Sequence, residues 1–152
     1  MTQTTYTVAQ PTDFLPIVKE ILGYPYVTTG QAVVIALMGD LGAGKTTFTQ
    51  QLGAVLGVSG SITSPTFTIM KQYPLTHAQF DTLVHIDAYR FESESEAVPL
   101  RLTEIFETPR TIVCLEWPER IATVVSDTAI KMNIEVGPNN DRIVTIDWPT
   151  GK

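Results

Sequence analysis

The sequence predicts an α/β domain of three layers, in which helices cover both faces of a mostly parallel sheet and a C-terminal β-hairpin closes the chain. Residues 32–38, 83–86 and 111–115 are continuous apolar runs, which indicate strands buried on both faces, as in a parallel sheet. Segments with helical spacing alternate with these runs. The length of 152 residues fits one domain over residues 1–152.

In the N-terminal half, Thr12 is expected to be the N-cap of an amphipathic helix that extends to about Leu22. The first apolar run then enters a glycine-rich loop at residues 39–44. A helix is predicted over residues 45–56, because its apolar side chains recur at helical spacing and Gly57 follows as a C-terminal signal.

The C-terminal half supplies the remaining elements of the predicted sheet. Strands are expected over residues 67–73, 129–136 and 142–148, and short helices over residues 100–106 and 118–125. The sequence Gly-Pro-Asn-Asn-Asp separates the last two strands and favours a hairpin.

Composition and charge exclude several classes of function. The chain has 10 Lys+Arg against 16 Asp+Glu, a net charge of −6, which argues against direct binding of nucleic acid or of an anionic membrane. Its single cysteine, Cys114, excludes an internal disulfide and has no neighbouring ligands for structural zinc. Because there is no signal pattern and no apolar run of membrane-spanning length, a cytoplasmic protein is expected.

The strongest signal is a phosphate-loop (P-loop) pattern, G-x-x-x-x-G-K-[ST]. It is formed by Gly39-Asp40-Leu41-Gly42-Ala43-Gly44-Lys45-Thr46, followed by Thr47. Glycines allow backbone N–H groups to turn toward a phosphate, and the following helix presents its positive dipole end to the same group. The Lys45 ammonium would reach the β- and γ-phosphates, and the Thr46 hydroxyl would ligate Mg²⁺. The absence of an N-K-x-D motif favours ATP over GTP.

Two acidic residues stand where a P-loop protein needs them. Asp87 directly follows one buried apolar run and Glu116 directly follows the next. Since the carboxyl ends of parallel strands meet at the ligand crevice, both acids should lie near the phosphates. One would hold the hydrated Mg²⁺ and the other would orient the attacking water. We expect Asp87 in the metal shell and Glu116 on the water or the metal, although the pattern does not fix which acid does which.

Two further residues, Thr66 and Trp117, have two readings each, and His85 has one. The hydroxyl of Thr66, in Ser-Pro-Thr-Phe, would sense the γ-phosphate or its Mg²⁺, or the segment simply enters a strand. Trp117 is a core residue or a functional aromatic side chain. His85 is expected to be a packed strand residue, because the sequence offers no partner pattern for a triad or a metal site.

Together these motifs resemble the TsaE family, formerly YjeE. The resemblance rests on Gly39 to Phe48, Ser64-Pro65-Thr66-Phe67, His85-Ile86-Asp87-Ala88-Tyr89-Arg90 and Leu115-Glu116-Trp117-Pro118-Glu119. It implies the αβα P-loop NTPase fold and a small Mg²⁺-dependent ATPase of bacterial tRNA threonylcarbamoyladenosine (t6A) synthesis. In that family TsaB and TsaD are the partner proteins, TsaD transfers the group, and tRNA is contacted through the partners.

The resemblance also implies roles for individual residues. Lys45 and Thr46 match the phosphate and Mg²⁺ residues, and Asp87 and Glu116 match the Walker B acid and the metal or catalytic acid. By the same match, Thr66 is the switch hydroxyl and Trp117 a functional aromatic residue. Thr12 corresponds to a residue near the nucleotide base, although Pro16 replaces the usual glycine, and Arg142 to a basic residue entering the last strand.

Two other functions fit the P-loop pattern. A small-molecule kinase would need an acceptor pocket and commonly an arginine-bearing lid, and the five arginines of the chain do not cluster in sequence. A non-hydrolysing, nucleotide-gated binding module would keep its function in a Glu116→Gln variant.

Overall fold

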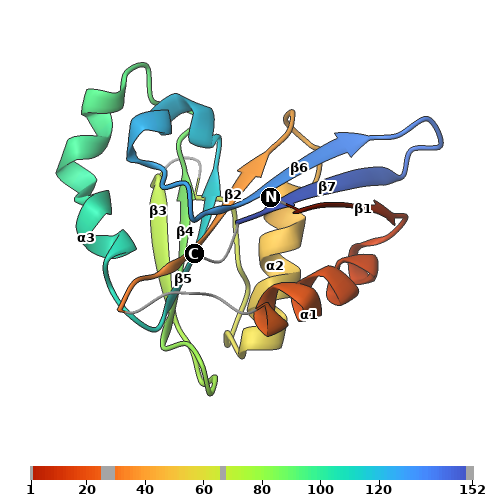
Figure 1. The fold of residues 1–152 in the computed structure, drawn as a ribbon, viewed down its shortest axis with the longest axis horizontal. Coiled ribbons are helices and arrows are strands. Elements are labelled where there is room, and N and C mark those ends of the chain that lie inside the picture. Colours follow the sequence, from red (N-terminus) through yellow and green to blue (C-terminus); the bar gives the residue numbers. More distant parts are fainter. Residues whose placement is uncertain (1, 25–29, 66–67, 150–152) are drawn as a thin grey trace.

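The computed structural model describes residues 2–24, 30–65 and 68–149. In these residues one seven-stranded sheet has the order β1-β7-β6-β2-β5-β4-β3 (Figure 1). The strands are β1 (Thr2–Val8), β2 (Val33–Met38), β3 (Met70–Pro74), β4 (Thr82–Asp87), β5 (Thr111–Glu116), β6 (Ile130–Val136) and β7 (Arg142–Trp148). The α-helices are α1 (Leu15–Gly23), α2 (Lys45–Leu56) and α3 (Leu102–Phe106), and the 3₁₀ helices are η1 (Pro11–Phe14), η2 (Glu94–Leu100) and η3 (Pro118–Val124).

The central strands β6, β2, β5 and β4 are parallel to one another, which confirms the predicted parallel core. The predicted hairpin is also present, because β6 and β7 pair antiparallel. Antiparallel strands complete both edges, with β3 on β4 and β1 on β7. Parallel alignment brings the carboxyl ends of β2, β4 and β5 to the same edge of the sheet, where ligands bind in open α/β sheets.

Helices cover both faces of the sheet, as the three-layer prediction requires. Alternate residues of β2 point to opposite faces, with Ile35 in one buried cluster and Val34 in the other. The first cluster packs α1 and α2 on the sheet and includes the edge-to-face pair Phe14–Phe48. The second packs η2, α3 and η3 on the opposite face. Figure 1 shows α1 and α2 on one side of the molecule and α3 on the other.

The N-terminal strand β1 was not predicted. Its seven residues are rich in β-branched threonine, yet only Val8 is buried, so the apolar alternation that signals a half-buried strand is absent. β1 is held by pairing with β7, and the Trp148 indole donates a hydrogen bond to Thr4 (2.9 Å).

The predicted N-cap at Thr12 is wrong. The chain first forms η1, whose N-cap is Gln10 in a capping box with Asp13, and Thr12 lies inside this turn. Helix α1 begins afterwards, with Pro16 in its first turn, where a proline is tolerated.

Two other predicted boundaries shift at residues with positive φ. Strand β3 begins at Met70 rather than at residue 67, because Ile69 has φ 70°; residues 66–67 lie outside the described residues. The helix predicted over residues 100–106 is divided at Arg101, whose φ is 55°, so that η2 ends before it and α3 begins after it. None of the helices in the described residues combines the length and the apolar character that crossing a bilayer requires.

Candidate phosphate-binding site

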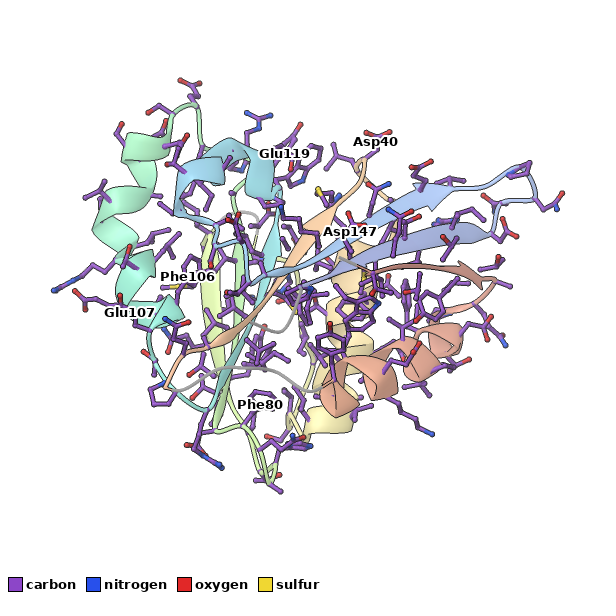
Figure 2. The ribbon with its side chains drawn as sticks, viewed as in Figure 1. Asp40, Phe80, Phe106, Glu107, Glu119 and Asp147 are labelled. Carbon is purple, nitrogen blue, oxygen red and sulfur yellow. The ribbon has the colours of Figure 1, made fainter. Side chains whose placement is uncertain are left out.

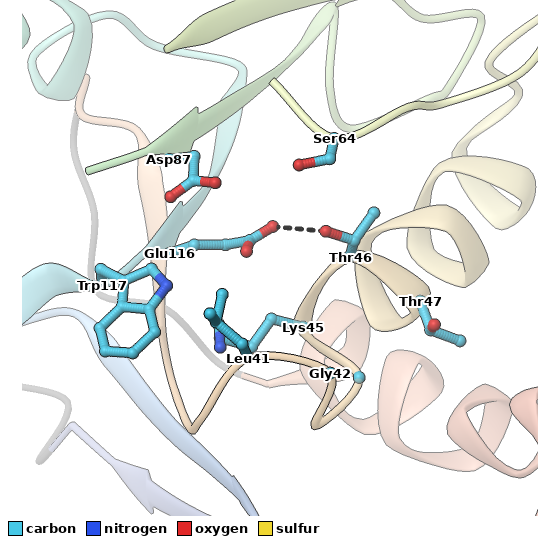
Figure 3. Close-up of a pocket in the computed structure, with 10 residues that line it drawn as sticks. Leu41, Gly42, Lys45, Thr46, Thr47, Ser64, Asp87, Glu116 and Trp117 are labelled. Carbon is cyan, nitrogen blue, oxygen red and sulfur yellow. Dashed lines mark hydrogen bonds between the residues drawn. The ribbon is translucent and has the colours of Figure 1, made fainter. Parts of the chain in front are cut away.

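A crevice of about 260 Å³ lies at the carboxyl ends of β4 and β5, beside the start of α2 (Figure 3). The strand β2 leads into the P-loop that forms one wall, and the neighbouring strand ends form the other. The lining residues are Leu41, Gly42, Gly44, Lys45, Thr46, Thr47, Ser64, Asp87, Glu116 and Trp117. Sequence positions from 41 to 117 therefore meet in one site.

The P-loop is fixed against the β6–β7 hairpin. Gly39 has φ 144°, and a Cβ at this position would overlap the backbone oxygen of Ile134 in β6. From β7, Arg142 donates from Nε to the carbonyl of Ala43 (2.8 Å) and from Nη2 to that of Gly42 (3.4 Å). The hairpin thus sets the position of the loop relative to the strand ends.

Lys45 is only 4% exposed, although it is a charged residue at the first turn of α2. Its ammonium donates hydrogen bonds to the carbonyls of Gly39 and Asp40, the latter at 2.9 Å, and lies 4.6 Å from the ring centroid of Trp117. Burial lowers the pKa of Lys45 below its usual value, and the nearby carboxylates, Glu116 first, oppose that shift. The ammonium is therefore fixed at the crevice by the loop it belongs to.

The carboxylates around the crevice give its rim an acidic character. Asp40 and Glu119 lie at the same end of the molecule (Figure 2), and each raises the pKa of Lys45, as do Glu116 and Asp87. A site that binds a polyanion while surrounded by carboxylates needs cations in addition to its lysine, which is consistent with a divalent metal.

Glu116 is the centre of the polar contacts in the crevice. It is 4% exposed, and its Oε2 accepts a hydrogen bond from the Thr46 hydroxyl at 2.9 Å. The same oxygen lies 2.6 Å from Nε2 of His85, which is fully buried. Asp87 is the register partner of Glu116 on the adjacent strand, so the two carboxylates come from neighbouring strand ends.

The set of oxygen donors fits Mg²⁺. The carboxylates of Glu116 and Asp87 and the hydroxyl of Thr46 line the same crevice, and Figure 3 shows Glu116 and Thr46 pointing toward each other. Within the described residues no group of three or more His, Cys, Asp or Glu side chains could hold a metal. That is the usual situation for Mg²⁺, which is bound through one or two carboxylates and completes its shell with water and substrate phosphates.

Trp117 forms an aromatic wall of the crevice and packs against Tyr89 and Arg120. Its φ of 61° turns the chain directly after β5, while its N–H still bonds to the Leu37 carbonyl of β2 (3.2 Å). The ring contacts Tyr89 (5.1 Å between centroids), and the Arg120 guanidinium lies 6.0 Å from it. Trp117 is thus a residue of the site wall as well as a partner of the second apolar cluster.

The structure brings most of the predicted residues together, with some exceptions. Gly39, Asp40 and Ala43 line a separate hollow between the loop and β6, and Thr47 points away from Glu116 (Figure 3). Arg142 contacts the P-loop backbone, as described above. Thr12 is exposed on η1 and is not one of the residues that line the crevice. Thr66 lies outside the described residues.

Sequence reasoning missed the role of His85 in this arrangement. It was expected to be a packed strand residue without a partner, and it is buried, but it contacts Glu116. The signal is the spacing: His85 precedes Asp87 by two residues on β4, so both point to the same face as Glu116 of β5. Arg120 and Tyr89, which pack beside Trp117, could not be found because their proximity depends on tertiary structure alone.

The parallel core, the loop between β2 and α2 and the acidic strand ends define a protein of the phosphate-loop class. A comparison with protein families agrees and is more specific. The model of the family described as "Threonylcarbamoyl adenosine biosynthesis protein TsaE" matches residues 17–144, and the chain belongs to this family.

Individual relatives give the same result. The chain is 40% identical over 113 residues to "tRNA threonylcarbamoyladenosine biosynthesis protein TsaE" of Bacillus subtilis (strain 168), covering 74% of this chain and 67% of that protein. It is 42% identical over 95 residues to the protein of the same name from Synechocystis, covering 61% of this chain and 59% of that protein. The crystal structure of Bacillus subtilis YdiB superposes with a TM-score of 0.75 and 26% identity, covering 97% of this chain and 86% of that chain.

Proposed function

We propose that the protein is a Mg²⁺-dependent ATPase that supports t6A modification of tRNA. The observation that carries the proposal is the hydrogen bond from Thr46 to Glu116 beside the Lys45 ammonium, because it joins the expected metal and phosphate residues in one crevice. The names of the relatives support the pathway, and the P-loop pattern supports the nucleotide.

In this proposal Lys45 exchanges the carbonyls of Gly39 and Asp40 for the β- and γ-phosphates of ATP. We assign Thr46 and Glu116 to the metal, because they already contact each other, and Asp87 to the metal-bound waters and the attacking water. When bound, Mg²⁺ would neutralise charge on the phosphates. In hydrolysis the water oxygen bonds to the γ-phosphorus, the bond to the bridging oxygen breaks with its electron pair leaving on ADP, and the proton of the water passes by way of the Asp87 carboxylate to solvent.

The partners in this proposal are TsaB and TsaD, with tRNA bound by them and not by this chain. The net charge of −6 supports that division, since a surface with more acidic than basic groups is poorly suited to hold a polyanion. Hydrolysis should be slow without partners, because no arginine is among the described residues that line the crevice and an arginine that stabilises the transition state can come from a partner.

A complementation experiment tests the pathway. A bacterium depleted of its own TsaE would express this chain or its Lys45→Ala variant, and the t6A content of its tRNA would be measured by mass spectrometry. The proposal expects the chain to restore t6A and the variant to fail. Full restoration by Lys45→Ala, at an equal protein level, would contradict it.

A second variant distinguishes an ATPase from a non-hydrolysing, nucleotide-gated binding module. Glu116→Gln keeps the size of the side chain but removes its charge, so it should retain nucleotide binding measured without Mg²⁺ and lose t6A restoration. Restoration by Glu116→Gln would instead support the non-hydrolysing binding module, and a phosphorylated metabolite in a substrate screen would support the kinase.

A further inference from the structure

The buried imidazole of His85 makes its polar contact with the proposed metal-binding acid. Its Nε2 lies 2.6 Å from Oε2 of Glu116, and the side chain is fully buried in β4. A carboxylate offers only acceptors, so Nε2 carries the proton and donates. The contact runs between adjacent parallel strands, close to the edge of the sheet where Glu116 enters the crevice.

The second ring nitrogen of His85 has no compensating contact. Nδ1 is buried and has no hydrogen-bond partner among the described residues. Burying an imidazole with one nitrogen unpartnered costs free energy that an apolar side chain of the same size would not. The polar contact that His85 gains in its buried position is the hydrogen bond to Glu116. This contact indicates a role at the crevice rather than in the core.

Thr46 and His85 contact the same oxygen of Glu116, but only Thr46 lines the crevice. In the proposed function the Thr46 hydroxyl offers an oxygen lone pair to the metal, while its O–H can still donate to Glu116. His85 is fully buried and is not one of the residues that line the crevice, so its hydrogen bond to Glu116 does not compete with a ligand there. It can therefore hold Glu116 with or without the metal.

We propose that His85 is a positioning residue: its Nε2–H anchors the Glu116 carboxylate at the crevice, with or without the metal on the Thr46 hydroxyl. The inference rests on the proposed function, because it concerns the same Mg²⁺–nucleotide site. It adds a residue outside the crevice lining, acting through Glu116 and not on the nucleotide.

Two amide variants test the anchor with matched polarity. In His85→Gln the side-chain nitrogen reaches the place of Nε2, whereas in His85→Asn it reaches only the place of Nδ1 and misses Glu116. His85→Asn should be the less stable of the two, because it is one methylene smaller and leaves its amide and Glu116 without this hydrogen bond, so binding is compared at a temperature at which both variants are folded. His77→Asn, at the only other histidine of the chain, serves as the control away from the crevice.

The readout is the Mg²⁺ dependence of binding of a non-hydrolysable ATP analogue, measured by calorimetry with Mg²⁺ and with EDTA. The dissociation constant in EDTA divided by the dissociation constant in Mg²⁺ reports the coupling between metal and nucleotide. We expect His85→Asn to lower this ratio by about 10-fold or more and kcat by about 10- to 100-fold, with the EDTA constant unchanged within about twofold. His85→Gln and His77→Asn should keep the wild-type ratio within about threefold.

Each other outcome rejects the anchor. Equal ratios in His85→Asn and the wild type would remove His85 from the site, and equal losses in His85→Asn and His85→Gln would reduce it to a packing residue. If the wild-type protein itself shows no effect of Mg²⁺ on nucleotide binding, the proposed function fails and the inference falls with it. If only the variants behave contrary to expectation, the proposed function stands.

Discussion

The position of the P-loop against β6 can be tested by comparing alanine at two of its glycines. Gly39 and Gly42 both have positive φ, 144° and 80°, but only Gly39 has a close neighbour. A Cβ at Gly39 would lie closer to the backbone oxygen of Ile134 than the 3.0 Å that real Cβ atoms respect, whereas nothing lies within 4 Å of a Cβ at Gly42. Gly42→Ala is therefore a matched control for backbone strain alone.

The expected magnitudes follow from these contacts. Gly42→Ala should lower the free energy of unfolding by about 1–2 kcal/mol, the cost of a left-handed residue with a side chain. Gly39→Ala adds an overlap with a backbone atom that cannot rotate away, which costs a further ~1–3 kcal/mol. The difference between the variants should therefore be about 2 kcal/mol, a sizeable part of the stability of a domain of this size.

Urea denaturation followed by circular dichroism measures this difference directly. The slope of the free energy against urea should be the same in both variants, so that the midpoints report stability. Equal midpoints for Gly39→Ala and Gly42→Ala would refute the argument that close approach to Ile134 requires glycine at position 39.

Four further predictions concern single residues. Lys45→Ala should weaken Mg-ATP binding by about 10- to 100-fold, because the phosphates lose a charged donor; an unchanged dissociation constant in calorimetry would remove Lys45 from the site. Glu116→Gln should lower kcat by about 100-fold while sparing the nucleotide affinity measured without Mg²⁺, and steady-state kinetics showing full turnover would contradict its role. Arg142→Ala should destabilise the protein by about 1–3 kcal/mol, because the Gly42 and Ala43 carbonyls lose their partner; a urea midpoint equal to the wild type would count against this brace. Burial raises the pKa of Cys114 to about 12 from 9.0, so the folded protein keeps a proton that the unfolded chain loses above about pH 9. The contribution of Cys114 to the free energy of unfolding should therefore fall by about 1 kcal/mol per pH unit as the pH rises toward 12. Cys114→Val should lack this fall, and an equal dependence of the unfolding free energy on pH in the variant and the wild type would refute the argument.

The parts of the fold that the sequence predicts are those with a strong local signal. The apolar runs and the glycine-rich loop indicate the β2–loop–α2 unit, and the spacing of the last two strands indicates their hairpin. The strand β1 has no such signal, because it lies at the edge of the sheet and buries only Val8. The 3₁₀ turn at Thr12 depends on the capping box of Gln10 and Asp13, which competes with the simpler N-cap.

For the site, the sequence motifs identify most of the residues, whereas the contacts between them depend on tertiary structure. Asp87 and Glu116 could be placed at one edge because parallel strands end together. The contact of His85 with Glu116 requires the alignment of β4 with β5, which no local pattern specifies. Likewise, the contact of Arg142 with the loop joins residues that lie 99 positions apart in the sequence.

The most direct test of the proposed function is Mg²⁺-dependent ATP hydrolysis by the purified protein, alone and mixed with TsaB and TsaD from the same source. Lys45→Ala serves as the control in both conditions. The account predicts slow turnover alone, a clear increase with the two partners, and loss of both in the variant. Tight ATP binding with no stimulation by the partners would contradict it.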